Sequence, residues 1–140
     1  MYVVLFLFAI SIIYIPYAMK MIKKKQEESA AFLAANPTAS KIYPRVGLRG
    51  LYMAEQVMVT AVNDGAPDPF YDGLKEGQGV YALPGKNAIE VEYARTRPGI
   101  LHKSVTTTTG PTKQEIEVEA NKRYSLGFIR NENRFCLTEL

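Results

Sequence analysis

The stretch AIEVEY at residues 88–93 places an apolar side chain at every second position, and the stretch EIEVE at residues 115–119 does the same. A period of two is the pattern of a β-strand that buries one face and exposes the other. Turn-forming residues separate such stretches, at 64–65, 84–85, 98–99, 110–111, 121–122 and 131–133. The last five turns follow one another at intervals of ten to fourteen residues, a spacing typical of antiparallel sandwiches and barrels.

We therefore predict an all-β fold, an antiparallel β-sandwich of about seven to eight strands, preceded by a single N-terminal transmembrane α-helix. Strands are expected near residues 46–52, 55–63, 79–83, 88–95, 102–109, 113–119, 123–129 and 134–139. Their apolar faces suffice for one core, formed by Val57, Val59, Ile89, Val91, Tyr93, Ile116, Val118, Tyr124, Leu126, Phe128, Phe135 and Leu137.

The transmembrane prediction rests on Tyr2 to Met19, eighteen residues without a charge. As a helix this segment would be about 27 Å long, close to the hydrocarbon thickness of a bilayer, ~30 Å. A cleaved signal peptide is the main alternative, but no basic residue precedes the apolar run, and Pro16 would occupy position −3 of a cleavage motif that ends at Ala18. A soluble core helix is the other alternative.

Four membrane-flanking lysines follow the apolar segment, namely Lys20, Lys23, Lys24 and Lys25. Basic residues near the end of a span favour the cytoplasmic side, so we expect the β-domain in the cytoplasm of a single-pass cell-membrane protein. An N-terminal helix with a short tail also occurs in exported proteins, and that orientation stays open. The same lysines suit anionic lipid headgroups.

The chain divides into three expected parts. Residues 1–35 form the transmembrane helix with a basic juxtamembrane extension, because good helix formers continue to Ala35 before Asn36 and Pro37. Residues 36–45 form a linker, and residues 46–140 form the β-sandwich. Residues 41–140 hold thirteen Lys or Arg against twelve Asp or Glu, so the domain lacks the basic excess of a nucleic-acid binder, and no nucleic-acid partner is expected.

Catalytic chemistry finds little support in the sequence. The chain has a single histidine, His102, and a single cysteine, Cys136, which rules out a two-histidine metal site, a Cys/His zinc set and an intramolecular disulfide. Cys136 is expected to be a buried thiol of the last strand. We expect no enzyme activity, no cofactor, no metal site and no small-molecule substrate.

Two polar features have alternatives. Arg95 and Arg97 could bind an anion, or could form exposed ion pairs with Glu90 and Glu92. The acidic loop at residues 63–77 could hold a cation, tuck its apolar residues against the sandwich, or contact a partner. Its candidate partner-contact residues are Asp68, Phe70, Tyr71, Asp72 and Leu74. The threonines at 106–109 suit a solvent-facing strand edge that could accept a partner strand.

Two segments carry a resemblance to a known family. The stretch LPGK at 83–86 followed by AIEVEY at 88–93, and the later stretch EVEANKRYSL at 117–126, resemble PEGA-type and other small transthyretin-like bacterial β-sandwich domains over about fifty residues. The resemblance implies a tight turn into a strand and a tyrosine packed near a sandwich corner, without an active site. PEGA-type domains usually lie outside the cell, whereas the lysines favour the inside. The whole chain is also similar to short membrane proteins of Gram-positive anaerobes.

These observations favour a membrane-anchored, non-enzymatic interaction or scaffold domain, such as an accessory subunit of a membrane assembly. Its expected partners are the lipid bilayer and another protein. The alternative is an exported envelope-binding module for a cell-wall glycan or a protein ligand.

Overall fold

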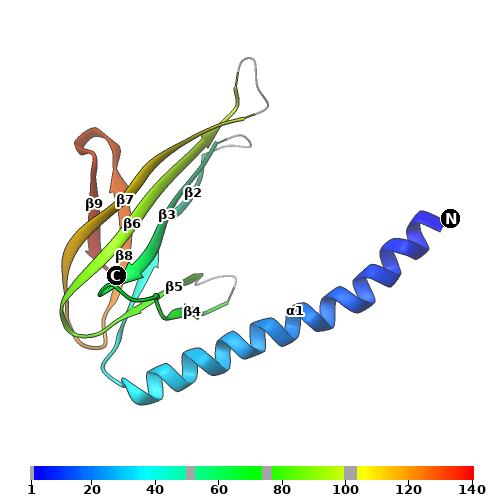
Figure 1. Ribbon diagram of the computed structural model, residues 1–140, viewed down its shortest axis with the longest axis horizontal. Coiled ribbons are helices and arrows are strands. Elements are labelled where there is room, and N and C mark those ends of the chain that lie inside the picture. Colours follow the sequence, from blue (N-terminus) through cyan, green and yellow to red (C-terminus); the bar gives the residue numbers. More distant parts are fainter. Residues whose placement is uncertain (1, 50–52, 74–76, 100–103) are drawn as a thin grey trace.

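The computed structural model describes residues 2–49, 53–73, 77–99 and 104–140, without the side chains of residues 2–9, 11, 48, 49 and 53. Within these ranges the chain forms one long helix, one short 3₁₀ helix and nine strands (Figure 1). They are α1 (Tyr2–Ala35), β1 (Ser40–Pro44), β2 (Val46–Arg49), β3 (Met53–Val62), β4 (Pro69–Tyr71), β5 (Gln78–Ala82), β6 (Gly85–Arg97), β7 (Val105–Val118), β8 (Arg123–Ile129), the 3₁₀ helix η1 (Arg130–Glu132) and β9 (Arg134–Glu139).

The strands form two sheets. Sheet A has the order β4-β5-β1-β8-β9, and sheet B has the order β2-β3-β6-β7. Neighbouring strands are antiparallel except β1 and β8, which are parallel. The expected two-layer β architecture is therefore present, but sheet A is mixed rather than purely antiparallel.

One core lies between the sheets, as predicted. All twelve residues expected to face it belong to the core cluster, nine of them buried and three packed against its side. The alternation that the sequence displays appears directly in β6, where Ile89, Val91 and Tyr93 are buried and the residues between them are partly exposed. Ile42 of β1 and Val80 and Ala82 of β5 also belong to this core.

Three strand assignments differ from the expectation. β1 lies inside the expected linker, and β4 lies inside the expected loop at 63–77. The predicted turn at Gly110-Pro111 is wrong, because β7 runs through it as one strand of fourteen residues. Gly110 and Pro111 stand opposite the single residue Glu92, since Thr109 pairs with Tyr93 and Thr112 with Val91. This is a β-bulge, and proline is tolerated there because β7 is an edge strand.

The helix ends where the sequence predicts. Asn36 donates from its main-chain N–H and its side-chain amide to the Phe32 carbonyl, at 2.9 and 3.1 Å, and Pro37 follows. α1 leaves the β-domain and its N-terminal part projects away from both sheets (Figure 1). Among the residues described with their side chains, no helix is long and apolar enough to cross a membrane. Much of the expected span, residues 2–9 and 11, lies outside those residues.

Candidate functional site

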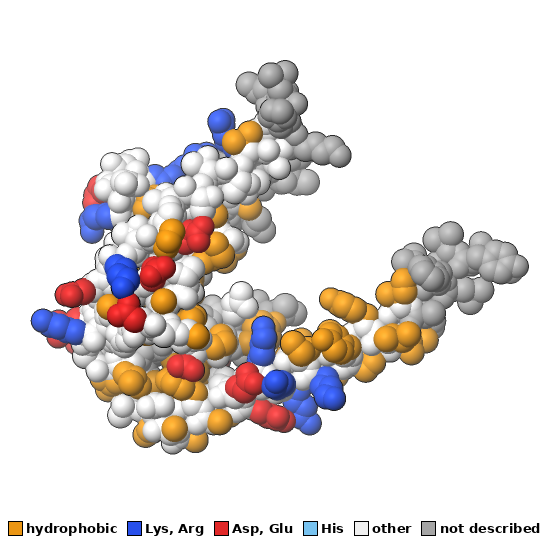
Figure 2. Space-filling view, in the orientation of Figure 1, with side chains coloured by type: hydrophobic (Ala, Val, Ile, Leu, Met, Phe, Trp, Pro, Cys, Tyr) orange, Lys and Arg blue, Asp and Glu red, His pale blue; other side chains and the backbone are white. Residues whose placement is uncertain are grey.

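The described outer part of α1 exposes apolar side chains to the surroundings. Between 46 and 74% of each large side chain is accessible at Ile10, Ile12, Ile13, Tyr14, Ile15, Tyr17 and Met19. The four lysines follow directly toward the domain, and all are exposed. Figure 2 shows this order along the helix, with hydrophobic side chains toward the N-terminus and basic ones closer to the domain.

The C-terminal part of α1 packs on the outer face of sheet A through aromatic side chains. The rings of Phe32 and Tyr81 stack with centroids 5.1 Å apart, and Ser29 Oγ lies 2.9 Å from the Tyr81 hydroxyl. Phe70 of β4 lies behind Tyr81 and Tyr43, at 5.0 Å from each ring. These residues form a second, smaller apolar cluster with Ala39, which we call the docking cluster.

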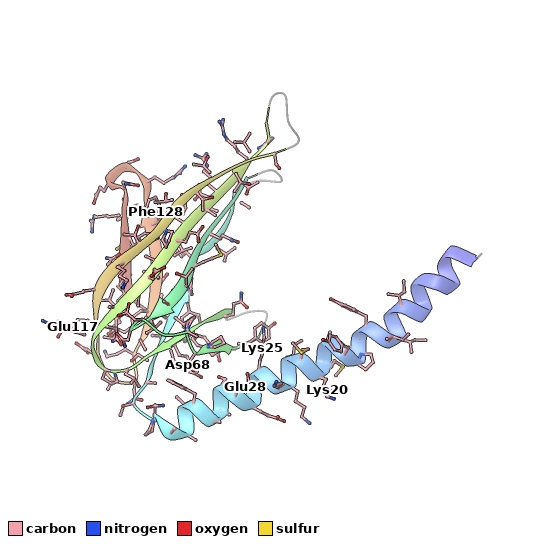
Figure 3. The ribbon with its side chains drawn as sticks, in the orientation of Figure 1. Lys20, Lys25, Glu28, Asp68, Glu117 and Phe128 are labelled. Carbon is pink, nitrogen blue, oxygen red and sulfur yellow. The ribbon has the colours of Figure 1, made fainter. Side chains whose placement is uncertain are left out.

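The structure divides the candidate partner-contact residues. Phe70 is only 3% exposed, so its ring serves the docking cluster, and the tucked alternative for this loop is confirmed at Phe70. Tyr71 and Asp72 are half-buried and Asp68 is exposed. Asp68 lies on the side of the domain that faces α1 (Figure 3). Leu74 lies outside the described residues.

Asp72 ties the loop to β1. Its carboxylate accepts hydrogen bonds from Lys41 Nζ at 2.7 and 2.9 Å and from the Tyr43 hydroxyl at 2.8 Å. Burial acts to raise the pKa of Asp72, but the hydrogen bonds from Lys41 and Tyr43 outweigh it and hold the pKa below its usual value. Asp72 is thus part of a structural ion pair rather than a free acidic group.

A pocket of about 460 Å³ opens where the chain crosses from one sheet to the other. β1 pairs with β8 as far as Pro44 and Leu126. Arg45 then bridges the sheets, since its N–H donates to the Leu126 carbonyl at 2.8 Å and its carbonyl accepts from the Val57 N–H at 2.9 Å. Beyond Leu126, β8 keeps β9 as its one partner among the described strands. The pocket lies along this uncovered part of β8 and beside β2 and β3.

One part of the pocket wall is apolar and aromatic. Val57, Tyr93 and Phe128 line it, and the rings of Tyr93 and Phe128 stack at 4.3 Å. Phe128 lies in the half of the domain away from α1 (Figure 3). Phe135 of β9 supports Phe128 from behind at 4.9 Å.

Charged residues converge on the same pocket. Glu55 Oε1 lies 3.3 Å from Arg130 Nη1 and 3.7 Å from Arg95 Nε. Arg95 therefore pairs with Glu55, its cross-strand neighbour on β3. Arg45 also lines the pocket, and its Nε donates to Ser125 Oγ at 3.2 Å.

The Tyr93 hydroxyl is buried in this setting. The residue is 7% exposed, and within the described part of the chain its oxygen makes no hydrogen bond of regular geometry. Burial raises the pKa of Tyr93, and the nearby Glu55 charge raises it further. The phenol therefore stays protonated at neutral pH, and a hydrogen-bond interaction with the Glu55 carboxylate adds to the rise of its pKa.

Cys136 and His102, the remaining residues that the sequence singles out, are not among the described residues of the pocket or of the docking cluster. Cys136 is half-buried on β9, with its sulfur 3.7 Å from Thr138 Oγ1, so the expectation of a buried thiol is wrong; Cys136 alternates with Phe135, which takes the core-facing position. His102 lies outside the described residues. Among the residues with described side chains, no three His, Cys, Asp or Glu side chains group as metal ligands do.

Comparison with known proteins gives no relative from which a function can be transferred. No family model, no curated protein and no solved structure matches this chain. The resemblance to PEGA-type domains stays a prediction, and the function must be argued from the geometry alone.

Proposed function

We propose that the chain is a membrane-anchored, non-enzymatic interaction domain that α1 holds at the bilayer. One observation carries the proposal: the exposed apolar surface of α1 from Ile10 to Met19, which no other described part of the chain covers. A helix that is apolar all round needs an apolar environment. With the uncharged residues 2–9 and 11, this surface has the length of a bilayer span.

The docking cluster supports an accessory or scaffold role. Because Phe32 stacks on Tyr81 and Ser29 lies within hydrogen-bond distance of it, the helix does not join the domain through a flexible linker. Movement of the anchor would therefore be passed to sheet A. The four lysines lie between the apolar surface and this contact, where lipid headgroups would meet them.

Partner binding would use the free edge of β7. Among the described strands β7 has one neighbour, β6, and its threonines at 106–108 are exposed. An edge of this length can accept an extended segment of another protein through main-chain hydrogen bonds. The loop at 63–77 is the weaker candidate, because its Phe70 is buried.

The anchor is tested with paired charge substitutions. Wild type should stay in the membrane fraction after an alkaline carbonate wash. Ile12→Lys combined with Ile15→Lys should be released, because each lysine near the centre of a span costs about 3 kcal/mol. Gln26→Lys, an exposed change on the same helix, is the matched control and should stay bound. Release of wild type by the wash would overturn the anchor.

The side of the membrane is tested with Asp68→Cys in a Cys136→Ser background, since Asp68 is exposed. Protection from an impermeant thiol reagent in intact cells, with labelling after lysis, supports the cytoplasmic orientation. Labelling in intact cells would instead support the exported envelope-binding module.

The edge is tested with a matched pair of variants. Thr106 on β7 and Thr96 on β6 lie opposite each other, with their hydroxyls 3.1 Å apart. Thr106→Lys and Thr96→Lys remove the same contact, but only the first places a charge on the free edge. A protein retained by wild type in mild detergent should be lost with Thr106→Lys and kept with Thr96→Lys. Equal retention by both variants would exclude the edge.

A further inference from the structure

We propose that the pocket between β2, β3 and β8 binds a small organic monoanion. Its carboxylate would meet Arg130 and the Tyr93 hydroxyl, and its apolar body would lie against Phe128 and Val57. This site is independent of the membrane anchor and of the β7 edge.

The cavity has the size of a ligand site, and its lining is mixed, with more polar than apolar surface. Its volume of about 460 Å³ falls within the ~300 to 1,000 Å³ that small-molecule sites occupy. Such sites combine an apolar lining with a few polar groups that fix the ligand. Here the stacked pair of Tyr93 and Phe128 supplies the apolar wall, and polar groups stand at one side of it.

The Tyr93 hydroxyl is a buried polar group of the pocket wall. Within the described residues it makes no hydrogen bond of regular geometry, and its interaction is with the Glu55 carboxylate; a buried hydroxyl without a good hydrogen bond costs about 1–3 kcal/mol. Phenylalanine would fill the same space without this cost. The oxygen of a bound carboxylate would accept this hydrogen bond.

Arg130 supplies the charge. Its side chain is 38% exposed, and within the described residues it forms an ion pair with Glu55 Oε1, at 3.3 Å from Nη1. A guanidinium carries five N–H donors in a fork that suits a carboxylate. Most of this fork remains available to a ligand on the pocket side.

The charge balance selects a monoanion. Among the residues that line the pocket, Glu55 contributes one negative charge, and Arg45 and Arg130 contribute two positive ones. The group therefore has a surplus of one positive charge, which a monoanion neutralises. A dianion would face the Glu55 carboxylate with a surplus of negative charge, and a cation would face two guanidinium groups.

Benzoate is a suitable probe, because it joins one carboxylate to one aromatic ring. Binding is measured with the full chain in lipid nanodiscs by equilibrium dialysis of radiolabelled benzoate, with empty nanodiscs as the blank. We expect saturable binding to one site, with a Kd in the millimolar range or tighter. Benzyl alcohol, which has the same ring without the charge, should bind at least about tenfold more weakly.

Two variants and one control locate the site. Arg130→Gln should weaken benzoate binding about tenfold or more, and Tyr93→Phe about threefold to tenfold. Arg134→Gln is the control, because Arg134 lies near the same turn but pairs with Glu132 and does not line the pocket; its binding should equal that of wild type. Circular dichroism establishes that each variant is folded.

Tyr93→Phe offers a readout that does not depend on the choice of ligand. Without ligand, this variant should be as resistant to urea as wild type or more so, because it removes a buried hydroxyl that lacks a good hydrogen bond. The proposal is overturned if benzoate shows no saturable binding up to about 10 mM, if benzyl alcohol binds equally well, or if Arg130→Gln binds like wild type. A large loss of stability in Tyr93→Phe would also overturn it, because the hydroxyl would then have a good internal hydrogen bond.

Discussion

Replacing Gly79 of β5 by alanine adds one methyl group and should destabilise the fold strongly. A Cβ atom there would lie 2.0 Å from the Ile42 carbonyl oxygen, 2.9 Å from the Ile42 carbonyl carbon and 2.8 Å from Phe70 Cζ. The Phe70 ring can tilt, but the Ile42 main chain belongs to β1, the neighbouring strand. Gly79→Ala must therefore move β5 away from β1 by about 1 Å or more to restore a normal contact.

The cost follows from what that movement breaks. β1 and β5 pair at three positions, from Ser40 with Ala82 to Ile42 with Val80. Each ladder hydrogen bond that is weakened or lost contributes about 1 kcal/mol, and forcing extra volume into a packed site costs about 1–3 kcal/mol. We expect Gly79→Ala to lower the free energy of unfolding by at least about 3 kcal/mol.

Urea unfolding of the full chain in nanodiscs, followed by near-ultraviolet circular dichroism of the tyrosines, measures this loss. Gly110→Ala is the control, because nothing lies within 4 Å of the added Cβ, and its stability should change by less than about 0.5 kcal/mol. If the free energy of unfolding of Gly79→Ala lies within about 0.5 kcal/mol of the wild-type value, the close approach of β5 to β1 is wrong. The arrangement of the docking cluster on β4 and β5 would then be wrong as well.

Three further changes test the loop, the helix contact and the bulge. Asp72→Asn should lower stability by about 1 kcal/mol at neutral pH. The depressed pKa of Asp72 means that its contribution is present above the unfolded pKa of about 4 and is lost as the pH falls through the folded value; urea midpoints of wild type and variant should therefore converge near pH 2, and a constant difference would contradict the ion pair. Phe32→Ala should speed amide exchange in residues 26–35 while leaving the core strands protected, because the stacking on Tyr81 is worth about 1 kcal/mol; exchange unchanged in the helix would mean that α1 is not docked. Pro111→Ala should change stability by less than about 1 kcal/mol by the same unfolding assay, because Pro111 lies in a bulge of an edge strand; a large loss would show that proline shapes the bulge.

The alternation of side chains was enough to find the core but not the sheet partners. In β6 and β7 every second residue is apolar over most of the buried part, and that pattern identifies the inward face directly. β1 has only five residues, one of which is proline, and β4 has three, so neither is long enough to display a period. The parallel pairing of β1 with β8 depends on where the chain travels after α1, and no local pattern encodes that route.

The turn signals were correct where a chain reversal needs a special backbone and failed where the same residues serve another purpose. Gly85 and Asn121 both have positive φ, at 105° and 57°, and both mark real reversals. Gly110 and Pro111 have the same composition as a turn, yet they form a bulge. A glycine followed by a proline interrupts regular strand pairing both in a turn and in a β-bulge. Only the pairing of the residues on both sides distinguishes a bulge from a turn.

The pocket could not be predicted from the sequence, for a different reason. Glu55 lies on β3, and Arg130 lies far along the chain in the 3₁₀ helix that follows β8; in the sequence each resembles an ordinary surface charge. They meet because β1 leaves sheet A after Pro44, which uncovers the end of β8 and opens the space between the sheets. The sequence indicates Arg95 as a possible anion ligand, but its proximity to Glu55 follows from the register of β3 against β6 rather than from any spacing along β6.

The two candidate sites share no residue, and this separation has a consequence for function. The docking cluster joins α1 to β4 and β5, whereas the pocket lies against β2, β3 and β8. Sheet A contains strands of both, and β1 lies between β5 and β8 in its strand order. A ligand in the pocket would therefore leave the anchor contact intact, and the docked helix would leave the pocket open. Benzoate should bind Phe32→Ala as tightly as wild type, and weaker binding would show that the helix contact and the pocket are coupled through β1.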